Sequence, residues 1–552
     1  MDKASPSIDT DALRAAASAW IADDPDPAAR AELAEVVAGL PGTAAELADR
    51  LAGPLRFGTA GLRGPVRAGP NGMNLAVVRA AARGLVRHLD ARGYTGPLVI
   101  GYDARRGSAE FAAETARVCT GAGRRALLLP RRLPTPVLAY AVRQLGAAAG
   151  VMVTASHNPP ADNGYKVYLS DGAQLAAPHD AELEAAIRAV GPLGEVPLGA
   201  DGEVLGEDVV RSYVAEVAAL ADPDSARDLT VAYTALHGVG GDVLTQVFTR
   251  AGFAAPLPAG EQQDPDPTFP TVAFPNPEEP GAMDLVRAVA AQTGADLAIA
   301  NDPDADRCAA AVPDPALGPP TDPAAWRMLT GDEVGVLLAD HLLTRGRRGT
   351  VATTIVSSSM LRALAERAGV PYVETLTGFK WIARAAEDLA FGYEEALGYA
   401  VAPQLVRDKD GISAALLLAE LAATSKASGR SLLDRLDELA AEHGVYATAP
   451  LTVRVTDLRV IADAMARLRA NPPGTLLGRP VTVEDLAPGA DVVILRGDGL
   501  RVVVRPSGTE PKLKAYLEAV VPVTDGLAPA RAEAAATLTT LRAEMSDTLG
   551  MN

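Results

Sequence analysis

One pattern occurs three times along this chain: a short apolar segment, a loop of small and polar residues, and then a segment with helical spacing of its apolar residues. It occupies residues 98–123, 229–252 and 350–370. Short apolar runs that alternate with helices are typical of α/β folds with parallel or mixed sheets. We therefore expect three tandem mixed α/β domains of similar topology.

The length and the C-terminal segment complete this domain plan. A chain of 552 residues exceeds what one core supports, and length alone predicts roughly three to five domains. The last strand-like runs, LTVRVT, ADVVILRG and LRVVVRP, alternate differently and predict a smaller C-terminal α+β domain, the domains being arranged around a central cleft. Polar and proline-rich joints place a helical extension at 1–53 and the four domains at 54–208, 209–323, 324–443 and 444–552.

Composition excludes several classes of function. The formal net charge of −18 argues against nucleic acid as a partner, because a phosphate backbone requires a basic face. No apolar stretch approaches the roughly 18 residues of a membrane span, and no signal peptide is visible. The two cysteines, Cys119 and Cys308, stand far apart in apolar surroundings and are expected to be buried free thiols. We therefore expect a cytoplasmic protein with no membrane partner.

The segment TASHNPPADNGYKVY contains the first candidate catalytic residue. Ser156 stands just past a predicted strand, where prolines, Asn163 and Gly164 hold the chain in a turn. A serine presented in this way can act as a nucleophile or carry a phosphoryl group. An isolated serine more often caps a turn, and the segment lacks the G-x-S-x-G spacing of serine hydrolases. This loop alone leaves both interpretations open.

The segment DPDADR presents three carboxylates at alternate positions, Asp302, Asp304 and Asp306. Hard oxygen ligands of this kind favour Mg²⁺ or Ca²⁺ over zinc. An EF-hand is excluded, because its sixth and twelfth positions, normally Gly and Glu, are here Arg307 and Pro313. A solvated acidic turn remains an alternative, although such close like charges repel unless a cation neutralises them. Arg307 could hold a phosphate beside the metal.

The segment RPSGTEPKLKAY follows a strand-like run near the C-terminus. Arg505, Ser507 and Thr509, with the backbone around Gly508, offer a guanidinium fork, two hydroxyls and exposed N–H groups. These groups are suited to binding an oxyanion. An ordinary turn is about equally compatible with this loop.

Three further loops carry polar candidates. In TLTGFKW, Lys380 could meet a phosphate or a sugar oxygen, and in FGYEEALGY, Glu394 and Glu395 could accept hydrogen bonds from sugar hydroxyls. A solvated glutamate pair is the ordinary alternative. The loop RFGTAGLRG contains Arg56 and Arg63 but lacks the G-x-G-x-x-G and Walker spacings, so it is weak evidence by itself.

Taken in order, TASHNPPADNGYK, DPDADR, GYEEALGY and RPSGTEPKLK resemble the motifs of the α-D-phosphohexomutase family, which includes phosphoglucomutases and phosphomannomutases. The resemblance spans roughly residues 40–520, with one motif in each expected domain. The forms RFGTAGLRG and TLTGFKW look most like a bacterial branch related to animal phosphoglucomutase-2 and phosphopentomutase. A joint match of four ordered motifs is far more specific than any one of them.

The resemblance implies a role for each matching position. Ser156 would be the phosphoserine. Mg²⁺ would be bound by Asp302, Asp304, Asp306 and the phosphate on Ser156. Lys166, with its pKa lowered by nearby cations, would be the general acid/base, with Arg63, His157 and Arg307 completing the catalytic group. The implied substrate-binding residues are Thr377, Gly378, Lys380, Glu394, Glu395, Lys409, Arg505, Ser507, Gly508 and Thr509.

The implied activity is the interconversion of glucose 1-phosphate and glucose 6-phosphate, an isomerase-class phosphotransfer through phospho-Ser156 and glucose 1,6-bisphosphate. Phosphomannomutase and phosphopentomutase are the alternatives within the family; a non-catalytic sugar-phosphate binder and a phosphatase with an aspartate nucleophile are the alternatives outside it. Many family members have E-x-S in the sugar loop, whereas this chain has Ala396 at the third position. Ala396 cannot donate the hydroxyl hydrogen bond that those members offer at this position. We expect a monomer or a homodimer.

Overall fold

The computed structural model describes residues 9–58, 61–455, 457–507 and 512–550. The chain forms two compact units. The first contains Met1–Leu329 and Gly398–Ala423, and the second contains Thr330–Leu397 and Thr424–Asn552. The chain therefore leaves the first unit, returns to it for a short segment, and leaves it again.

The first sheet of unit 1 has six strands in the order β1-β5-β4-β2-β3-β6. Its central strands are parallel, and β5 and β1 add an antiparallel edge. The strands are β1 (Leu62–Pro65), β2 (Leu98–Tyr102), β3 (Ala126–Leu128), β4 (Ala149–Val153), β5 (Asp162–Leu169) and β6 (Glu203–Val204). The helices that accompany them are α4 (Leu75–Ala91), α5 (Ser108–Gly121), α6 (Thr135–Gln144) and α7 (His179–Arg188).

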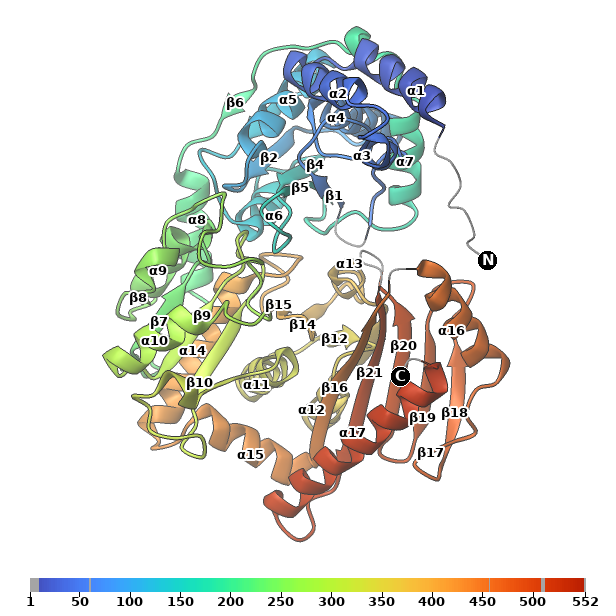
Figure 1. Cartoon of the computed structure of the whole chain (residues 1–552). Helices are drawn as coiled ribbons and strands as arrows, with labels where there is room; N and C mark the ends of the chain where they lie inside the picture. Colours follow the sequence, from blue (N-terminus) through green and yellow to red (C-terminus); the bar gives the residue numbers. More distant parts are fainter. Residues whose placement is uncertain (1–8, 59–60, 456, 508–511, 551–552) are drawn as a thin grey trace. The chain divides into compact units, whose positions relative to one another are not determined.

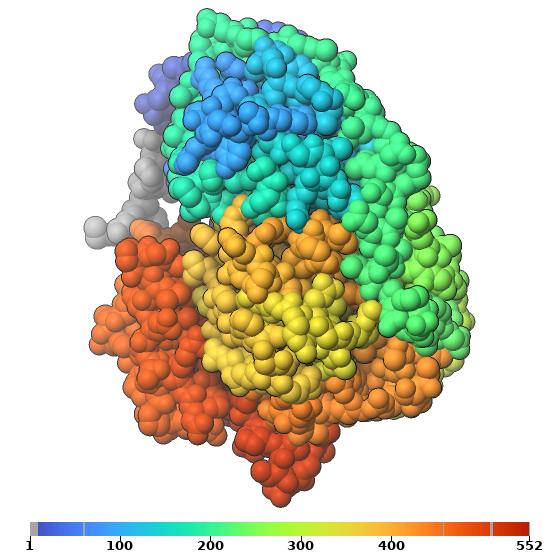
Figure 2. Space-filling model, turned by 180° about the vertical axis from the view of Figure 1, so that it is seen from behind, coloured from blue at the N-terminus to red at the C-terminus, as the bar shows by residue number. Residues whose placement is uncertain are grey.

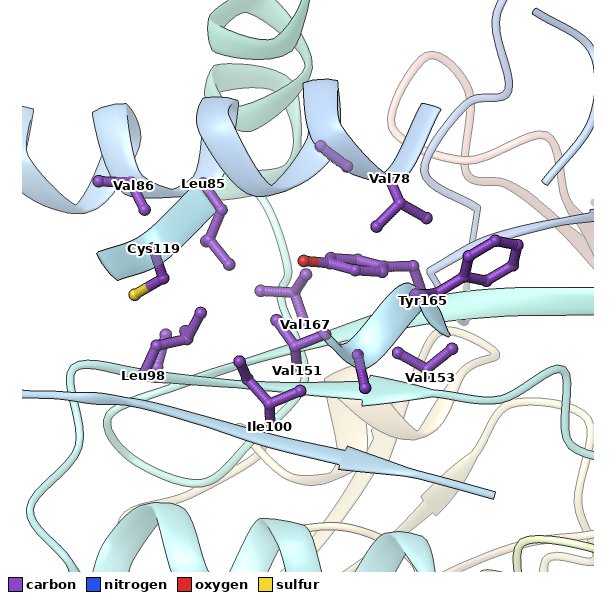
Figure 3. Close-up of a cluster of buried hydrophobic side chains, with 14 of the residues drawn as sticks. Val78, Leu85, Val86, Leu98, Ile100, Cys119, Val151, Val153, Tyr165 and Val167 are labelled. Atoms are coloured by element: carbon purple, nitrogen blue, oxygen red, sulfur yellow. The ribbon is translucent and has the colours of Figure 1, made fainter. Parts of the chain in front are cut away.

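Alternate residues of these strands face different helices, as the two-residue period of a strand requires. Val151 and Val153 of β4 belong to a buried cluster with side chains of α4 and α5 (Figure 3). Gly150, directly before Val151 and therefore on the opposite face, instead approaches Val142 and Leu138 of α6. The sheet is therefore covered on both faces, and ligands of such sheets gather beyond the carboxyl ends of the strands.

Three helices precede this sheet: α1 (Thr10–Asp23), α2 (Pro27–Ala38) and α3 (Ala44–Arg50). Asp9 and Asp26 accept hydrogen bonds from the first backbone N–H groups of α1 and α2, which satisfies donors that a helix start otherwise leaves free. Leu33 and Leu47 are fully buried in a small core formed by these helices. The segment from α7 to β6 then runs mostly exposed along the surface of unit 1, within the green band of Figure 2.

The second sheet of unit 1 has the order β11-β10-β9-β7-β8. Its strands are β7 (Val231–Thr234), β8 (Leu257–Pro258), β9 (Leu297–Ala300), β10 (Ala309–Pro313) and β11 (Trp326–Met328). The helices of this part are α8 (Asp208–Ala218), α9 (Gly240–Arg250) and α10 (Asp284–Thr293) (Figure 1). The segment that returns to unit 1 contains β15 (Gly398–Ala400), which is not a strand of this sheet, and the start of α14 (Gly411–Ala427). Ile412, Leu416 and Leu417 of α14 are fully buried.

Unit 2 contains a parallel group of strands in the order β13-β12-β14 and a six-stranded sheet in the order β16-β21-β20-β19-β18-β17. The parallel strands are β12 (Thr350–Thr354), β13 (Tyr372–Thr375) and β14 (Leu389–Glu394). The second sheet contains β16 (Val445–Arg454), β17 (Thr475–Leu476), β18 (Arg479–Asp485), β19 (Val493–Gly497), β20 (Leu500–Pro506) and β21 (Lys512–Val521), and its paired strands are antiparallel. The helices are α11 (Gly331–Thr344), α12 (Met360–Ala368), α13 (Phe379–Ile382), α15 (Leu432–His443), α16 (Leu458–Ala470) and α17 (Leu527–Leu549).

Arg501 joins these two parts of unit 2. Its guanidinium is buried and donates hydrogen bonds to the carbonyl oxygens of Ile355 and Ser357, in the loop after β12. It also lies 2.9 Å from a carboxylate oxygen of Glu518. Because Glu518 accepts hydrogen bonds from the backbone and hydroxyl of Ser359 as well, the loop after β12 is fixed to β20 and β21.

Candidate active site

Ser156 lies in the loop after β4, as predicted for a residue just past a strand end. Its backbone is in the left-handed region, with φ of 52°, a conformation that costs a non-glycine residue energy. The backbone N–H of Ser156 donates to Thr154 Oγ1 over 2.8 Å. The loop thus holds the serine hydroxyl in one direction, and the side chain is buried.

Arg105 also holds the loop that contains Ser156. Its guanidinium is buried and donates four hydrogen bonds to backbone carbonyl oxygens of the serine loop. The acceptors are Ser156 (2.6 Å), Asn158 (2.6 Å), Pro159 (2.8 Å) and Asp162 (3.0 Å). The guanidinium also stacks on the Phe269 ring, 4.9 Å from its centroid. One cation therefore organises the turn by binding four of its carbonyl groups.

The acidic loop after β9 meets the serine hydroxyl. Ser156 Oγ donates to Asp302 Oδ2 over 2.6 Å, and carboxylate oxygens of Asp302, Asp304 and Asp306 lie within 4.8 Å of one another. All three side chains are buried. Burial and the charges of Asp304 and Asp306 raise the pKa of Asp302 well above its ordinary value. Three carboxylates enclosed in this way require positive charge nearby.

Two lysines supply part of that charge. Lys166 Nζ, projecting from β5, lies 2.7 Å from Asp304 Oδ2 and 2.8 Å from Asp306 Oδ2. Lys409 Nζ, from the returning segment, lies 3.3 Å from Asp306 Oδ2. The prediction that nearby cations lower the pKa of Lys166 is wrong: burial acts to lower this pKa, but Asp304 and Asp306 outweigh burial and raise it.

The remaining predicted catalytic residues surround this group. His157 Nδ1 lies 3.3 Å from Ser156 Oγ. Burial, followed by the charges of Arg307 and Arg63, lowers the pKa of His157 well below its ordinary value, so the imidazole is neutral. Arg63, on β1, donates to Asn158 Oδ1 over 3.0 Å. The backbone N–H of Arg307 donates to Asp302 Oδ1 over 3.0 Å, which tightens the acidic loop.

The donor set fits Mg²⁺. Oδ1 of Asp304 and Oδ1 of Asp306 are buried and accept no hydrogen bond from the described part of the chain. Buried carboxylate oxygens without a donor are costly, and a hard divalent cation satisfies them with the ligand chemistry it prefers. His88, His179 and Glu182 form the other group of metal-ligating side chains found among the described residues.

The other predicted substrate-binding residues lie in unit 2. Gly378 has φ of 109° and directly precedes α13, in which Lys380 Nζ lies 5.7 Å from the Trp381 ring centroid. Thr377 is partly buried in the same loop. Glu394 ends β14, and Glu395 Oε2 lies 3.3 Å from Thr354 Oγ1 and 3.2 Å from Ser357 Oγ.

The predicted phosphate loop near the C-terminus is described only in part. Arg505 lies in β20, opposite Lys514 of β21. The backbone N–H of Ser507 donates to the Lys512 carbonyl oxygen over 2.8 Å. Gly508 and Thr509 lie outside the described residues.

Sequence reasoning missed several residues that support the site. Thr135 Oγ1 donates to Asp304 Oδ2 over 2.6 Å. Asp408, next to Lys409, accepts hydrogen bonds from Tyr168 Oη (2.7 Å) and Gln174 Nε2 (2.8 Å). Arg105 stands two residues after Asp103 at the end of a predicted strand, and a charged pair at that position was the one available clue. The contacts of Thr135 and Asp408 join segments more than 150 residues apart and leave no local pattern.

Comparison with known proteins assigns the chain to a family. Four models described as phosphoglucomutase/phosphomannomutase match in order: α/β/α domains I, II and III at residues 54–192, 211–316 and 330–442, and the C-terminal domain at 451–525. The chain belongs to the phosphoglucomutase/phosphomannomutase family. The predicted resemblance is confirmed, and so is the predicted fold class of three mixed α/β domains with a further C-terminal domain. Members of this family are phosphomutases, intramolecular phosphotransferases of the isomerase class.

Individual members of the family cover nearly the whole chain. A probable phosphomannomutase from Haemophilus influenzae is 45% identical over 460 residues, covering 81% of this chain and 93% of that protein. A phosphopentomutase from Mus musculus is 32% identical over 573 residues, covering 91% and 89%. The crystal structure of parafusin, a phosphoglucomutase from Paramecium in its open form, aligns with a TM-score of 0.70 at 20% identity over 90% of this chain and 95% of that one. At that identity the match shows a common fold.

No helix within the described part of the chain is both long enough and apolar enough to span a membrane.

Proposed function

We propose that this phosphomutase carries a phosphoryl group on Ser156 and transfers it between two hydroxyl groups of a sugar phosphate. The observation that supports this most directly is the 2.6 Å contact of Ser156 Oγ with Asp302. It joins a strained, buried hydroxyl to three carboxylates that can hold a cation. A serine that only capped a turn would have no need of this acidic partner.

Asp302, Asp304 and Asp306 would hold Mg²⁺, with a phosphate on Ser156 as a further ligand. Mg²⁺ at this position would offset negative charge on the oxygens of the transferring phosphoryl group. The chain's own cations would do the same from other directions: Arg307 at the acidic loop and Arg63 beside Asn158. Phosphoryl transfer asks a protein mainly for position and charge stabilisation, and this group of residues supplies both.

The transfer can be written in balanced steps. The Ser156–phosphorus bond breaks as a bond forms between phosphorus and the free sugar hydroxyl oxygen, which gives a sugar bisphosphate. The hydroxyl proton must leave as this happens, and the neutral His157 imidazole is the group placed to accept it. Lys166, whose pKa is raised, would act as the acid that returns a proton to the sugar oxygen freed in the second transfer. The bisphosphate then presents its other phosphate to Ser156, which takes it back. For a hexose, the bisphosphate is the 1,6 form.

Residues of unit 2 would hold the rest of the substrate. Glu394 and Glu395 would accept hydrogen bonds from sugar hydroxyls, and Lys380 would meet a phosphate or a sugar oxygen, as would Lys409 in unit 1. The non-reacting phosphate would bind Arg505, Ser507, Gly508 and Thr509. Two points support these substrate-binding roles: the hydrogen-bonding chemistry of the side chains, and their positions within the family motifs.

For the sugar, we favour mannose phosphate over the glucose phosphate that the sequence argument preferred. The relative with 45% identity is a probable phosphomannomutase. A pentose phosphate is the second candidate, because the Mus musculus phosphopentomutase matches over a larger share of this chain. The buried free thiols Cys119 and Cys308 support a reducing, cytoplasmic location.

The test uses the full chain with Mg²⁺ and a trace of the matching sugar bisphosphate, assayed in parallel on mannose 1-, glucose 1- and ribose 1-phosphate. We expect the largest kcat/KM with mannose 1-phosphate. Ser156→Ala should lose at least roughly three orders of magnitude of activity, since the covalent carrier is gone, and should no longer take up label from phosphorylated substrate. Ser170→Ala, an exposed serine at the end of β5, is the matched control.

One result would overturn the proposed mechanism, and another would overturn the proposed sugar. Near-normal turnover in Ser156→Ala would exclude the phosphoserine. A clear preference for ribose or glucose 1-phosphate, with Ser156 still essential, would retain the mechanism and reject mannose as the substrate.

A further inference from the structure

A second group of metal-ligating side chains lies in unit 1 outside the proposed catalytic site. It contains His88 near the end of α4, and His179 and Glu182 in the first turn of α7. His88 Nε2 and His179 Nδ1 are 3.3 Å apart. Glu182 Oε2 lies 3.7 Å from His88 Nδ1 and 3.9 Å from His179 Nδ1. Two of the six histidines of the chain therefore meet at one carboxylate.

The separations suit a single bound ion. Ligand atoms about 2.0–2.1 Å from a tetrahedral metal are roughly 3.3 Å from one another. The 3.3 Å contact uses Nε2 of His88 and the 3.7 Å contact uses Nδ1, so a bound ion would take only one of these two nitrogens. With one ligand atom from each residue, the three atoms lie within 4.8 Å of one another, and rotation of the side chains would bring them closer to that value. His179 and Glu182 stand three residues apart on one helix and so share a face, while His88 approaches from a different helix. Three donors from two packed helices form a partly rigid site.

The three side chains are partly enclosed. His88 is 4% exposed, and the side chains of His179 and Glu182 are 20% and 37% exposed. The contact between His88 Nδ1 and Glu182 is longer than a hydrogen bond, so no hydrogen bond between these two groups has to break when an ion binds.

We propose that His88, His179 and Glu182 bind one divalent transition-metal ion of the Zn²⁺ class, with water completing its coordination. Two imidazoles and one carboxylate are a donor set that Zn²⁺ accepts and that Mg²⁺ and Ca²⁺, which prefer all-oxygen ligands, do not. The site is thus chemically distinct from the three aspartates. It is independent of the proposed mutase activity.

One neighbouring group opposes metal binding. Arg92 forms two hydrogen bonds with the Glu182 carboxylate. Arg92 is largely exposed, and an ion pair at the surface is worth little, so a cation can replace the guanidinium at one oxygen. Arg92 therefore provides a second, opposite test: removing it should strengthen binding, whereas removing a ligand should weaken it.

A bound ion would also act on the segment that contains Phe57. Glu184, two residues after Glu182 on α7, accepts a hydrogen bond from the backbone N–H of Phe57 over 3.0 Å. Fastening α7 to α4 would hold that acceptor, and with it Phe57, in place.

The experiment is a calorimetric titration of the full chain with Zn²⁺ in millimolar Mg²⁺, which occupies the aspartates. We expect one Zn²⁺ per chain at this site. His179→Gln and Glu182→Gln should each weaken binding about tenfold or more, since even outer partners of metal ligands are worth 10–100-fold. Arg92→Gln should tighten binding severalfold. His341→Gln, on α11 in the other unit, should change nothing. Substitution by Co²⁺ should give the visible absorption of a tetrahedral site.

The proposal fails if His179→Gln binds Zn²⁺ as the unchanged chain does. It also fails if Zn²⁺ binding is abolished by Asp304→Asn and untouched by Glu182→Gln, because the ion would then belong to the aspartates. His88→Gln serves as a confirming variant only where its melting temperature shows that it is folded.

Discussion

Replacing Arg105 by alanine should loosen the serine loop and slow the proposed reaction. Four charge-assisted hydrogen bonds would be lost, together with the stacking on Phe269. At roughly 1.5–3 kcal/mol per bond, their sum gives an upper limit of about 6–12 kcal/mol. Water can enter the vacated space and satisfy some of the carbonyls, so the loss of about 3–5 kcal/mol typical of removing one partner from a buried charge pair is the better guide.

This loss has two measurable consequences. The melting temperature of unit 1 should fall by up to about 6–20 °C, since about 1 kcal/mol corresponds to roughly 2–4 °C in a domain of about 150–250 residues and unit 1 is larger. A serine displaced by about 1 Å should cost about a hundredfold in kcat. Calorimetric melting, hydrogen exchange of the amides of residues 154–164 and the mutase assay report these effects separately.

Arg106→Ala is the matched control, because that neighbouring side chain is exposed and should affect neither property. Arg105→Lys should recover only part of the loss, since an ammonium group cannot reach four carbonyls as a planar fork does. If Arg105→Ala melts, exchanges and reacts like Arg106→Ala, the argument that this arginine organises the loop is refuted.

Three further predictions concern other parts of the chain. Burial raises the pKa of Asp332 to about 6, so the folded state holds this proton more tightly than the unfolded chain does. The free energy of unfolding of unit 2 should therefore fall by about 2–3 kcal/mol as pH rises from about 4 to 6. Asp332→Asn should remove this dependence in melting curves taken across that range. Gly238→Ala would place a Cβ 2.3 Å from Pro303 Cα, so it should shift the acidic loop and weaken Mg²⁺ binding by calorimetry, whereas Gly260→Ala, which meets nothing within 4 Å, should not. Asp304→Asn should lower activity through metal affinity, and failure of excess Mg²⁺ to restore any activity would argue that Asp304 is not a ligand.

Much of the fold was predictable because it follows from local rules. Buried strands and amphipathic helices each leave a periodic pattern in the sequence, and the repeats at 98–123, 229–252 and 350–370 predicted the three α/β domains. The loops with Ser156 and Asp302 were found because each follows a strand directly. The end of a strand is where such a fold gathers its ligands.

The rest of the site depends on distances that no local pattern encodes. Arg105 binds backbone carbonyls, which every residue has, so nothing in the sequence marks its acceptors. The pKa of Lys166 was predicted to fall because its cationic neighbours were considered without the 2.7 Å and 2.8 Å contacts to Asp304 and Asp306. The direction of such a shift is decided by which charge is nearer, and only the structure gives that.

The return of the chain to unit 1 has a consequence for how the protein is made. Lys409 and the buried face of α14 belong to this unit, yet they follow the whole of residues 330–397. When residues up to Leu329 have left the ribosome, the core of unit 1 is therefore incomplete. It still lacks α14 and Lys409, the second lysine beside Asp306. Unit 1 cannot complete its core until residue 423 has emerged, and until then part of its apolar surface is exposed to water and to chaperones.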